Sequence, residues 1–241
     1  MLTSLFRRLT GRAAFAAPAP EMPLCVIGDV HGCLTQLEAL LSQVPSDHRV
    51  VLVGDYVDRG ENSAGVLRLV SARRDFTCLM GNHEDMLLQF LKDPHGEGAR
   101  WLRFGGLQTL ASFGVSGVRS DMSPDELTDC RDKLQTAMGA SLVQWLTDLE
   151  TQVFTGNVLV VHAGADPAVA PADQKDKTLI WGHPSFPTTD RRDGVWVVHG
   201  HTIVTEAQSN RGRIAVDTGA FATGRLSAVC LDGSEPRFLT T

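Results

Sequence analysis

The sequence predicts an α/β fold whose later strands include antiparallel pairs, and therefore a mixed sheet or two packed sheets. Short apolar runs alternate with helical patterns early in the chain, and strand-like runs return in its last third. The chain has 241 residues, of which 43% are hydrophobic and 21% are charged. This length and composition are sufficient for one large domain with a substantial core.

The first third of the chain predicts strand–helix units. The runs "PLCVIGD" and "HRVVLVGD" are typical of parallel strands covered on both faces. Between them, "LTQLEALLSQV" carries its leucines at helical spacing. "SAGVLRLVSA" followed by "FTCLMGN" predicts a second helix and strand, and "HEDMLLQFL" begins another helix.

The rest of the chain divides into a helical region and a strand-rich region. Residues from about 94 to 150 are mostly helical in pattern and are expected to form a cap-like part of the domain. Within them, Ser123, Pro124 and Glu126 predict a helix start with a capping box. "TQVFTGNVLVVHAG" predicts a hairpin, "GVWVVHGHT" a strand, and "RLSAVCLDGSEPRFL" a hairpin that turns at Asp232–Gly233.

Residues 1–22 predict a flexible N-terminal segment that leads into a single domain over residues 23–241. The segment lacks the unbroken apolar region of a secretory signal. No run approaches the length of a membrane span, although Leu2, Leu5, Phe6 and Leu9 leave a weak membrane-surface contact open. Five cysteines without a CxxC pair indicate neither a zinc knuckle nor a disulfide framework, which favours a cytoplasmic protein with reduced thiols.

The net charge of −6 argues against a general nucleic-acid-binding protein, because phosphate backbones require a basic face. A partner with one small phosphate group remains compatible with this charge.

Polar residues follow the ends of five predicted strands. The first three strands end in Gly and then a polar residue, and the last two are followed by histidines: Asp29 and His31, Asp55 with Asp58 and Arg59, Asn82 and His83, His162, and His201. Because ligands bind outside the carboxyl ends of strands in open α/β sheets, these side chains are expected to converge.

Several carboxylates in one pocket require a positive counter-charge, and divalent metal ions supply it. Oxygen and imidazole ligands without thiolate favour manganese, iron or zinc, and we expect Mn²⁺ with Fe or Zn as alternatives. Two metals bridged by one carboxylate are the usual arrangement for in-line attack on phosphorus.

The motifs "GDVHG", "GDYVDRG", "GNHE", "VHAG" and "GHT", in this order, resemble those of calcineurin-like metallophosphoesterases. Within this family, the complete motifs "GDYVDRG" and "GNHE" resemble those of the phosphoprotein phosphatase branch, which includes bacterial serine/threonine phosphatases. The resemblance implies an α/β/β/α sandwich, in which helices flank two packed, mostly mixed sheets. It also implies two divalent metal ions and direct attack on phosphorus by a hydroxide that bridges them.

The resemblance implies a role for each site residue. Asp29 and His31 would bind the first metal, Asp55 would bridge both metals, and Asn82, His162 and His201 would complete the second. Arg59 would hold a phosphate oxygen, and Asn82 would also face the substrate. His83 would donate a proton to the leaving oxygen while Asp58 orients it. His199, also in "VHGHT", is interpreted as structural.

The sequence departs from the family where many relatives carry a second phosphate-binding arginine. In "LIWGHPSFPTTDRRDGVWVV", His183 stands near the expected position. His183 could take part of the phosphate contact, Arg191 or Arg192 could fold back, or the site could have one arginine.

The leading functional hypothesis is a protein phosphatase acting on phosphoserine or phosphothreonine, and also phosphotyrosine. The alternative is a symmetrical dinucleoside polyphosphate hydrolase, and an inactive metal-binding scaffold is the third reading. Asp58 favours the phosphatase, because the dinucleotide hydrolases tend to depart from "VDRG" at that position.

Overall fold

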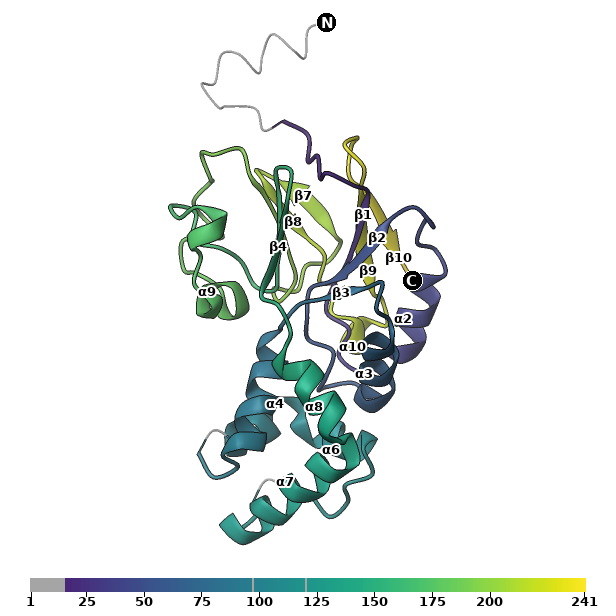
Figure 1. The fold of residues 1–241 in the computed structure, drawn as a ribbon, viewed down its shortest axis with the longest axis vertical. Coiled ribbons are helices and arrows are strands. Elements are labelled where there is room, and N and C mark those ends of the chain that lie inside the picture. Colours follow the sequence, from purple (N-terminus) through teal and green to yellow (C-terminus); the bar gives the residue numbers. More distant parts are fainter. Residues whose placement is uncertain (1–15, 97, 120) are drawn as a thin grey trace, which may run out of the picture.

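Two five-stranded sheets lie face to face, and the helices α4 to α8, between residues 82 and 147, lie beyond one end of them (Figure 1). The computed structural model describes residues 16–96, 98–119 and 121–241. Helices cover the outer face of the first sheet, and a short helix with its loops covers the outer face of the second. The predicted α/β/β/α sandwich is confirmed.

The first sheet has the strand order β10-β9-β1-β2-β3, in which β1, β2 and β3 are parallel. β9 runs antiparallel to both β1 and β10, so the predicted C-terminal hairpin is present. The strands are β1 (Leu24–Ile27), β2 (Arg49–Leu52), β3 (Thr77–Cys78), β9 (Ser227–Leu231) and β10 (Arg237–Thr240). The predicted helices α2 (Leu34–Leu41) and α3 (Ser63–Ala72) connect the parallel strands.

The second sheet has the strand order β4-β5-β6-β8-β7, in which β5, β6 and β8 are parallel. The strands are β4 (Gln152–Thr155), β5 (Val158–Val161), β6 (Trp196–His199), β7 (Gln208–Asn210) and β8 (Arg213–Ala215). η2 (Pro171–Asp173) and α9 (Asp176–Trp181) lie between β5 and β6. The sequence does not predict the β7–β8 hairpin, because β7 is short, polar and exposed and has no alternating pattern.

Alternation along the strands divides the core into layers. Val26 and Val51 point between the sheets, where they join Val160 and Val198 in one buried cluster. Ile27 points to the other side and joins the cluster that includes the leucines of α2. The continuous apolar runs of the sequence are therefore strands buried on both faces.

The region from about 94 to 150 is helical, as the sequence predicts. Its helices follow α4 (Asn82–Lys92) and are α5 (Gly98–Trp101), the π-helix η1 (Leu102–Gly106), α6 (Leu107–Ser112), α7 (Pro124–Met138) and α8 (Ala140–Thr147). Ser123 caps α7, because its Oγ accepts from the Glu126 N–H at 3.4 Å and its own N–H donates to Glu126 Oε2 at 2.8 Å. The predicted capping box is confirmed.

η1 brings this helical region against the loop that follows β2. Gly105 has a φ of 117°, and a Cβ placed on it would lie 2.6 Å from the backbone nitrogen of Arg59. Glycine therefore permits both the backbone conformation and the close approach. The π-helix ends next to Arg59, one of the predicted site residues.

The predicted flexible segment lies partly outside the described residues, as do Leu2, Leu5, Phe6 and Leu9. The part that is described lies along the β4–β5 hairpin. Ala19 N–H donates to Asn157 Oδ1 at 2.7 Å, and Glu21 N–H donates to Thr155 Oγ1 at 3.1 Å. Residues 16–22 are thus tied to the second sheet by hydrogen bonds. Within the described residues, no helix is both long enough and apolar enough to cross a bilayer.

Candidate dinuclear metal centre

The predicted site residues meet where parallel strands of both sheets end. The loops after β1, β2 and β3 and the start of α4 carry one group, and the loops after β5 and β6 carry the other. From the first sheet come Asp29, His31, Asp55, Asp58, Arg59, Asn82 and His83, and from the second come His162 and His201. The carboxyl ends of both sheets therefore form one site.

Five of these residues have a left-handed backbone conformation. The φ angles are 43° for His31, 53° for Asp55, 71° for Asp58, 67° for Arg59 and 63° for His201. Among the described residues, Arg211 is the one other non-glycine residue with a positive φ. Such conformations cost roughly 1–3 kcal/mol each, persist where the surrounding structure imposes them, and cluster in active sites and ligand-binding loops of proteins.

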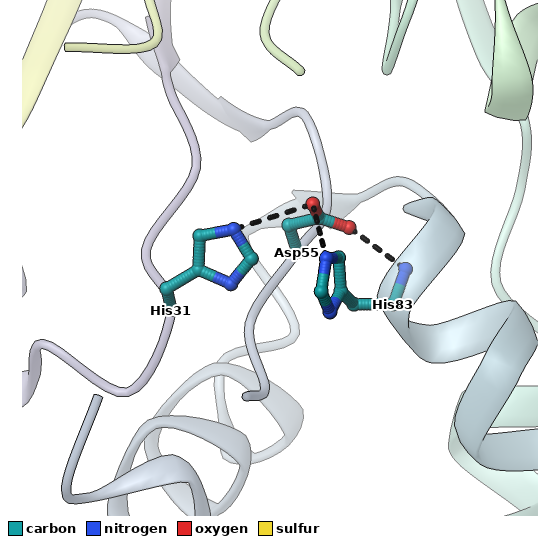
Figure 2. A group of neighbouring side chains, drawn as sticks. All are labelled: His31, Asp55 and His83. Atoms are coloured by element: carbon teal, nitrogen blue, oxygen red, sulfur yellow. Dashed lines mark hydrogen bonds and ion pairs between the residues drawn. The ribbon is translucent and has the colours of Figure 1, made fainter. Parts of the chain in front are cut away.

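Asp55 lies at the centre of the site, and Figure 2 shows the His31 and His83 rings beside one of its carboxylate oxygens. Its Oδ2 lies 3.4 Å from His31 Nε2 and 3.9 Å from His83 Nε2. Its Oδ1 lies 3.4 Å from His162 Nε2 and accepts from the His83 backbone N–H at 3.0 Å. Asp55 thus belongs to two ligand groups, one with His31 and His83 and one with His162 and His201.

Asn82 joins the second group through its side-chain oxygen. Asn82 Oδ1 lies 2.9 Å from His162 Nε2 and 2.8 Å from His201 Nδ1. Because His162 Nδ1 donates to the Val53 carbonyl at 3.0 Å, its Nε2 presents a lone pair to Asn82 Oδ1 and Asp55 Oδ1. Lone pairs that face one another repel, and a cation bound between them would remove this repulsion by accepting all of them. The residues therefore fit a metal ion.

The histidines and carboxylates have the electrostatic properties that metal binding requires. Burial lowers the pKa of His31 to about 3 and that of His162 to about 4, so both imidazoles are neutral ligands. Burial raises the pKa of Asp29 well above its ordinary value, and the nearby charges of Asp217 and Asp55 raise it further. A buried carboxylate cluster of this kind requires a cationic partner.

Asp29 lies beside the two ligand groups and is fixed by the backbone of the loop after β6. Its Oδ2 and Oδ1 accept from the His201 N–H at 3.0 and 3.1 Å. A Cβ on Gly200 would overlap Asp29 Oδ1, so only glycine allows this approach. Asp217, which follows β8, is also buried here, and burial raises its pKa to about 6. The sequence patterns predict no role for Asp217. It is the aspartate of "AVDTGAF" and, like Asp29 and Asp55, it follows a strand, but β8 is too short to be recognised from the sequence.

His83 and Asp58 form a buried pair in the arrangement that the resemblance implies. His83 Nδ1 lies 2.6 Å from Asp58 Oδ2. Burial alone would lower the pKa of His83, but Asp55 and Asp58 outweigh it and raise this pKa above its ordinary value. A histidine held in this way can deliver a proton from Nε2.

Two residues of the helical region hold Asp58. Trp101 Nε1 donates to both carboxylate oxygens, at 2.9 and 3.1 Å, and Thr109 Oγ1 donates to Oδ1 at 2.6 Å. Both side chains are buried. Helical periodicity identifies them as core residues but gives no sign that their polar atoms reach Asp58.

Glu84 is the central hydrogen-bond acceptor for the loop after β2. Its carboxylate accepts from the N–H groups of Asp55 at 2.7 Å, Tyr56 at 2.8 Å, Gly81 at 3.1 Å and Val57 at 3.2 Å. Burial and the charge of Asp55 raise the pKa of Glu84 to about 8, while the backbone donors act in the opposite direction. The "GNHE" motif contains Glu84, but the sequence does not predict that it organises the loop.

Arg59 lies over the mouth of the site, between two histidines. Its Nη1 donates to His31 Nε2 at 3.1 Å and its Nη2 to His83 Nε2 at 3.0 Å. The guanidinium also lies 4.9 Å from the centre of the Phe221 ring. A planar donor in this place can bind a phosphate oxygen bidentately once it leaves the histidines.

Arg191 is one of the residues that could supply the phosphate contact of the missing second arginine. Arg191 is buried, pairs with Asp193 and donates to the carbonyls of Asp166 at 3.0 Å and Val169 at 2.9 Å. The idea that Arg191 folds back onto phosphate is therefore wrong, because its donors are already used.

The other two replacements for the second arginine are less buried than Arg191, and His183 is partly exposed. His183 Nε2 lies 3.5 Å from Asp166 Oδ2, and its Nδ1 accepts from the Ser185 N–H at 3.3 Å. Arg192 is exposed. A phosphate contact by His183 stays a prediction. His199 packs edge-on against Phe186, with ring centroids 5.0 Å apart, and faces away from the site.

Comparison with known proteins supports the assignment suggested by this geometry. Residues 22–205 match the calcineurin-like phosphoesterase family. A symmetrical bis(5'-nucleosyl)-tetraphosphatase of Pseudomonas fluorescens is 42% identical over 89% of this chain and 90% of its own length. The asymmetrical bis(5'-nucleosyl)-tetraphosphatase of Oceanobacillus iheyensis is 28% identical over 86% and 88%. Serine/threonine-protein phosphatase 2 of Escherichia coli is 40% identical, but over 34% of this chain and 37% of its own.

Solved structures share the fold across nearly the whole chain. A structure assigned only provisionally as a diadenosine tetraphosphatase has a TM-score of 0.64 at 21% identity and covers 95% of this chain and 98% of its own. A cold-active protein-tyrosine phosphatase of a Shewanella species has a TM-score of 0.57 at 20% identity, covering 95% and 83%. The chain therefore belongs to the calcineurin-like phosphoesterases, which are metal-dependent hydrolases with a dinuclear centre.

Proposed function

We propose that this protein hydrolyses dinucleoside polyphosphates, with a bis(5'-nucleosyl) tetraphosphate as its substrate. One observation carries the proposal: two relatives with this activity in their names align with 86–90% of both chains. The named protein phosphatase aligns with 34% of this chain. Similarity over a whole domain includes the surfaces that select a substrate, whereas a short match is confined to shared motifs.

Two divalent metal ions would be held by the residues that the site brings together. Asp29 and His31 would bind one ion, Asn82, His162 and His201 would bind the other, and Asp55 would contact both. When bound, the ions would supply the positive charge and the activation of water that attack on phosphorus requires. We propose manganese, since oxygen and imidazole ligands suit it, with iron or zinc as alternatives.

The side chains around the metal ligands would handle the substrate. Arg59 would leave His31 and His83 and bind a phosphate oxygen, because a polyphosphate is a stronger acceptor than a neutral imidazole. This movement would free His83 Nε2 to carry a proton to the leaving phosphate oxygen. Asp58 would keep His83 in the required tautomer throughout.

Protein phosphatase activity, the leading hypothesis from the sequence, becomes the second candidate. Its support from the sequence is Asp58 in "VDRG", a position at which the dinucleotide hydrolases tend to differ. In this structure Asp58 binds His83, Trp101 and Thr109. Orienting a proton donor serves either reaction, so Asp58 does not distinguish them.

The test is metal-dependent turnover by the protein stripped of metal and reconstituted with Mn²⁺. Diadenosine tetraphosphate, a phosphothreonine peptide and a phosphotyrosine peptide are compared at equal concentration. We expect kcat/KM for the dinucleotide to exceed that for either peptide, with Asp55→Asn as the inactive blank. The products also define the cleavage position, since symmetrical hydrolysis gives two ADP and asymmetrical hydrolysis gives AMP and ATP. Faster hydrolysis of a peptide would overturn the proposal.

A further inference from the structure

An exposed aromatic ring stands at the mouth of the proposed active site. Phe221 lies in α10 (Ala220–Thr223), immediately after the loop that carries Asp217. Its ring centre lies 4.9 Å from the Arg59 guanidinium carbon and 5.4 Å from the His31 ring centre, in an edge-on arrangement with His31. Phe221 nevertheless remains 37% exposed.

A second exposed apolar side chain comes from the loop after the predicted metal ligand His201. Ile203 is 51% exposed, and its Cγ2 would lie 3.2 Å from a Cβ placed on Gly219. Ile203 therefore covers the backbone that leads into α10. The large hydrophobic side chains that are exposed among the described residues are Met22, Phe104, Phe154, Ile203 and Phe221. Of these, Ile203 and Phe221 lie on the segments that follow β6 and β8, next to the site.

We infer that Phe221 is the stacking surface for a nucleobase of the substrate, with Ile203 extending the apolar contact. The inference rests on the proposed function, because it assigns the nucleoside part of that substrate to this place. A phosphate bound by Arg59 would lie beside Phe221, and the base is joined to the phosphate chain through its ribose. Every base has a flat π-face, so an aromatic side chain can bind it without selecting among bases.

The ring also supports Arg59 through a cation–π contact, and this second role must be separated from stacking. Loss of support for Arg59 would weaken binding of any phosphate, with or without a base. Loss of stacking would weaken binding of the dinucleotide alone. The informative quantity is therefore the KM for diadenosine tetraphosphate divided by the inhibition constant of inorganic tripolyphosphate, which has no base.

Four variants of the full-length, Mn²⁺-loaded protein measure this ratio. We expect Phe221→Ala to raise it about tenfold, given the usual effect of removing a base–aromatic stack. Phe221→Trp should keep the ratio near the wild-type value, and Phe221→Leu, which keeps apolar area but no π-face, should resemble Phe221→Ala. Phe154→Ala is the matched control, because Phe154 is 50% exposed on β4, the edge strand of the second sheet, where it pairs with Leu159.

The outcomes distinguish this inference from the proposed function. If the wild type cleaves the dinucleotide and Phe221→Ala changes both constants equally, the ring only supports Arg59 and the inference is wrong while the function stands. If Phe221→Ala impairs a phosphotyrosine peptide more than the dinucleotide, the ring binds that amino acid instead. If the wild type does not cleave the dinucleotide, the proposed function fails and the assignment of a nucleobase fails with it.

Discussion

His83 Nδ1 lies 2.6 Å from Asp58 Oδ2, and this contact joins the loop after β2 to the first turn of α4. Both side chains are buried. The carboxylate keeps the proton on Nδ1 and stabilises the imidazolium, so that Nε2 can donate toward the site. In the proposed mechanism, the pair therefore defines Nε2 as the nitrogen that would deliver the proton.

Replacing the proton donor tests this assignment. His83→Asn should lower kcat by about 10²-fold or more, because general acid catalysis contributes roughly that amount. The loss should shrink with p-nitrophenyl phosphate, whose leaving group departs without a proton. An equal loss with both substrates would show that His83 acts on the metal ligands instead, as its position 3.9 Å from Asp55 Oδ2 allows.

Asp58→Asn should move the alkaline limb of the kcat profile to lower pH. Burial alone would lower the pKa of His83, while Asp55 and Asp58 raise it. Removing one carboxylate lowers this pKa, and the acid form is then lost at lower pH. The measurement is kcat across pH 6–9 for both proteins, and an unmoved limb would contradict the role of Asp58.

Trp101→Phe should lower kcat while keeping most of the packing. The substitution removes the indole N–H that donates to Asp58 and leaves an aromatic ring in the same buried place. The lost hydrogen bond to a charged acceptor costs roughly 1.5–3 kcal/mol, measured as the free energy of unfolding in urea. Trp145→Phe, in α8, is the matched control because it also replaces a tryptophan of the helical region by phenylalanine, at a ring whose centre lies 6.0 Å from that of the Tyr56 ring. Equal kcat for both variants would show that Asp58 needs no support from the Trp101 N–H.

Much of the fold can be predicted because buried positions carry apolar residues, and these form recognisable runs and helical spacings in the sequence. The runs ending at Gly28 and Gly54 are strands buried on both faces, and the polar residues after them reach the site. β7 cannot be predicted in this way, because it is an exposed, polar edge strand without an apolar pattern. The contacts of Trp101 and Thr109 with Asp58 escape prediction for another reason. They span 43 and 51 residues of sequence, and no local pattern encodes a pairing over that distance.

The site illustrates the same limit in its backbone. Motifs such as "GDYVDRG" identify which residues gather, but not that Asp55, Asp58 and Arg59 adopt positive φ angles. Nor do they show that the Glu84 carboxylate holds that loop through backbone N–H groups. These features depend on tertiary contacts that overcome the local backbone preference.

Metal binding should stabilise the protein through Asp55. At a free Mn²⁺ concentration 100 times the dissociation constant, a site adds about 2.7 kcal/mol, which corresponds to a Tm increase of about 5–10 °C for a chain of this size. Asp55→Asn should abolish most of this increase. Asp121→Asn is the control, because Asp121 is an exposed partner of Arg119. The measurement is Tm in chelator and in Mn²⁺, and an equal increase in both variants would place the bound ions elsewhere.

His199 should make the metal-free protein less stable in weak acid. Burial lowers the pKa of His199 to about 4, whereas the unfolded chain has the ordinary value of about 6.5. Between these values the unfolded state binds a proton that the folded state does not, so the free energy of unfolding falls as pH falls. From pH 7 to pH 5 this one histidine should account for about 2 kcal/mol.

His199→Asn isolates that contribution from those of the other buried histidines and carboxylates. An asparagine amide can replace the Nδ1–H that donates to the Gly200 carbonyl at 2.9 Å, so the local hydrogen bond is kept while the titration is removed. Urea unfolding at pH 7 and pH 5 in chelator should give a difference about 2 kcal/mol smaller for the variant than for the wild type. Equal differences would mean that His199 gains a proton in the folded state, which its buried position against Phe186 opposes.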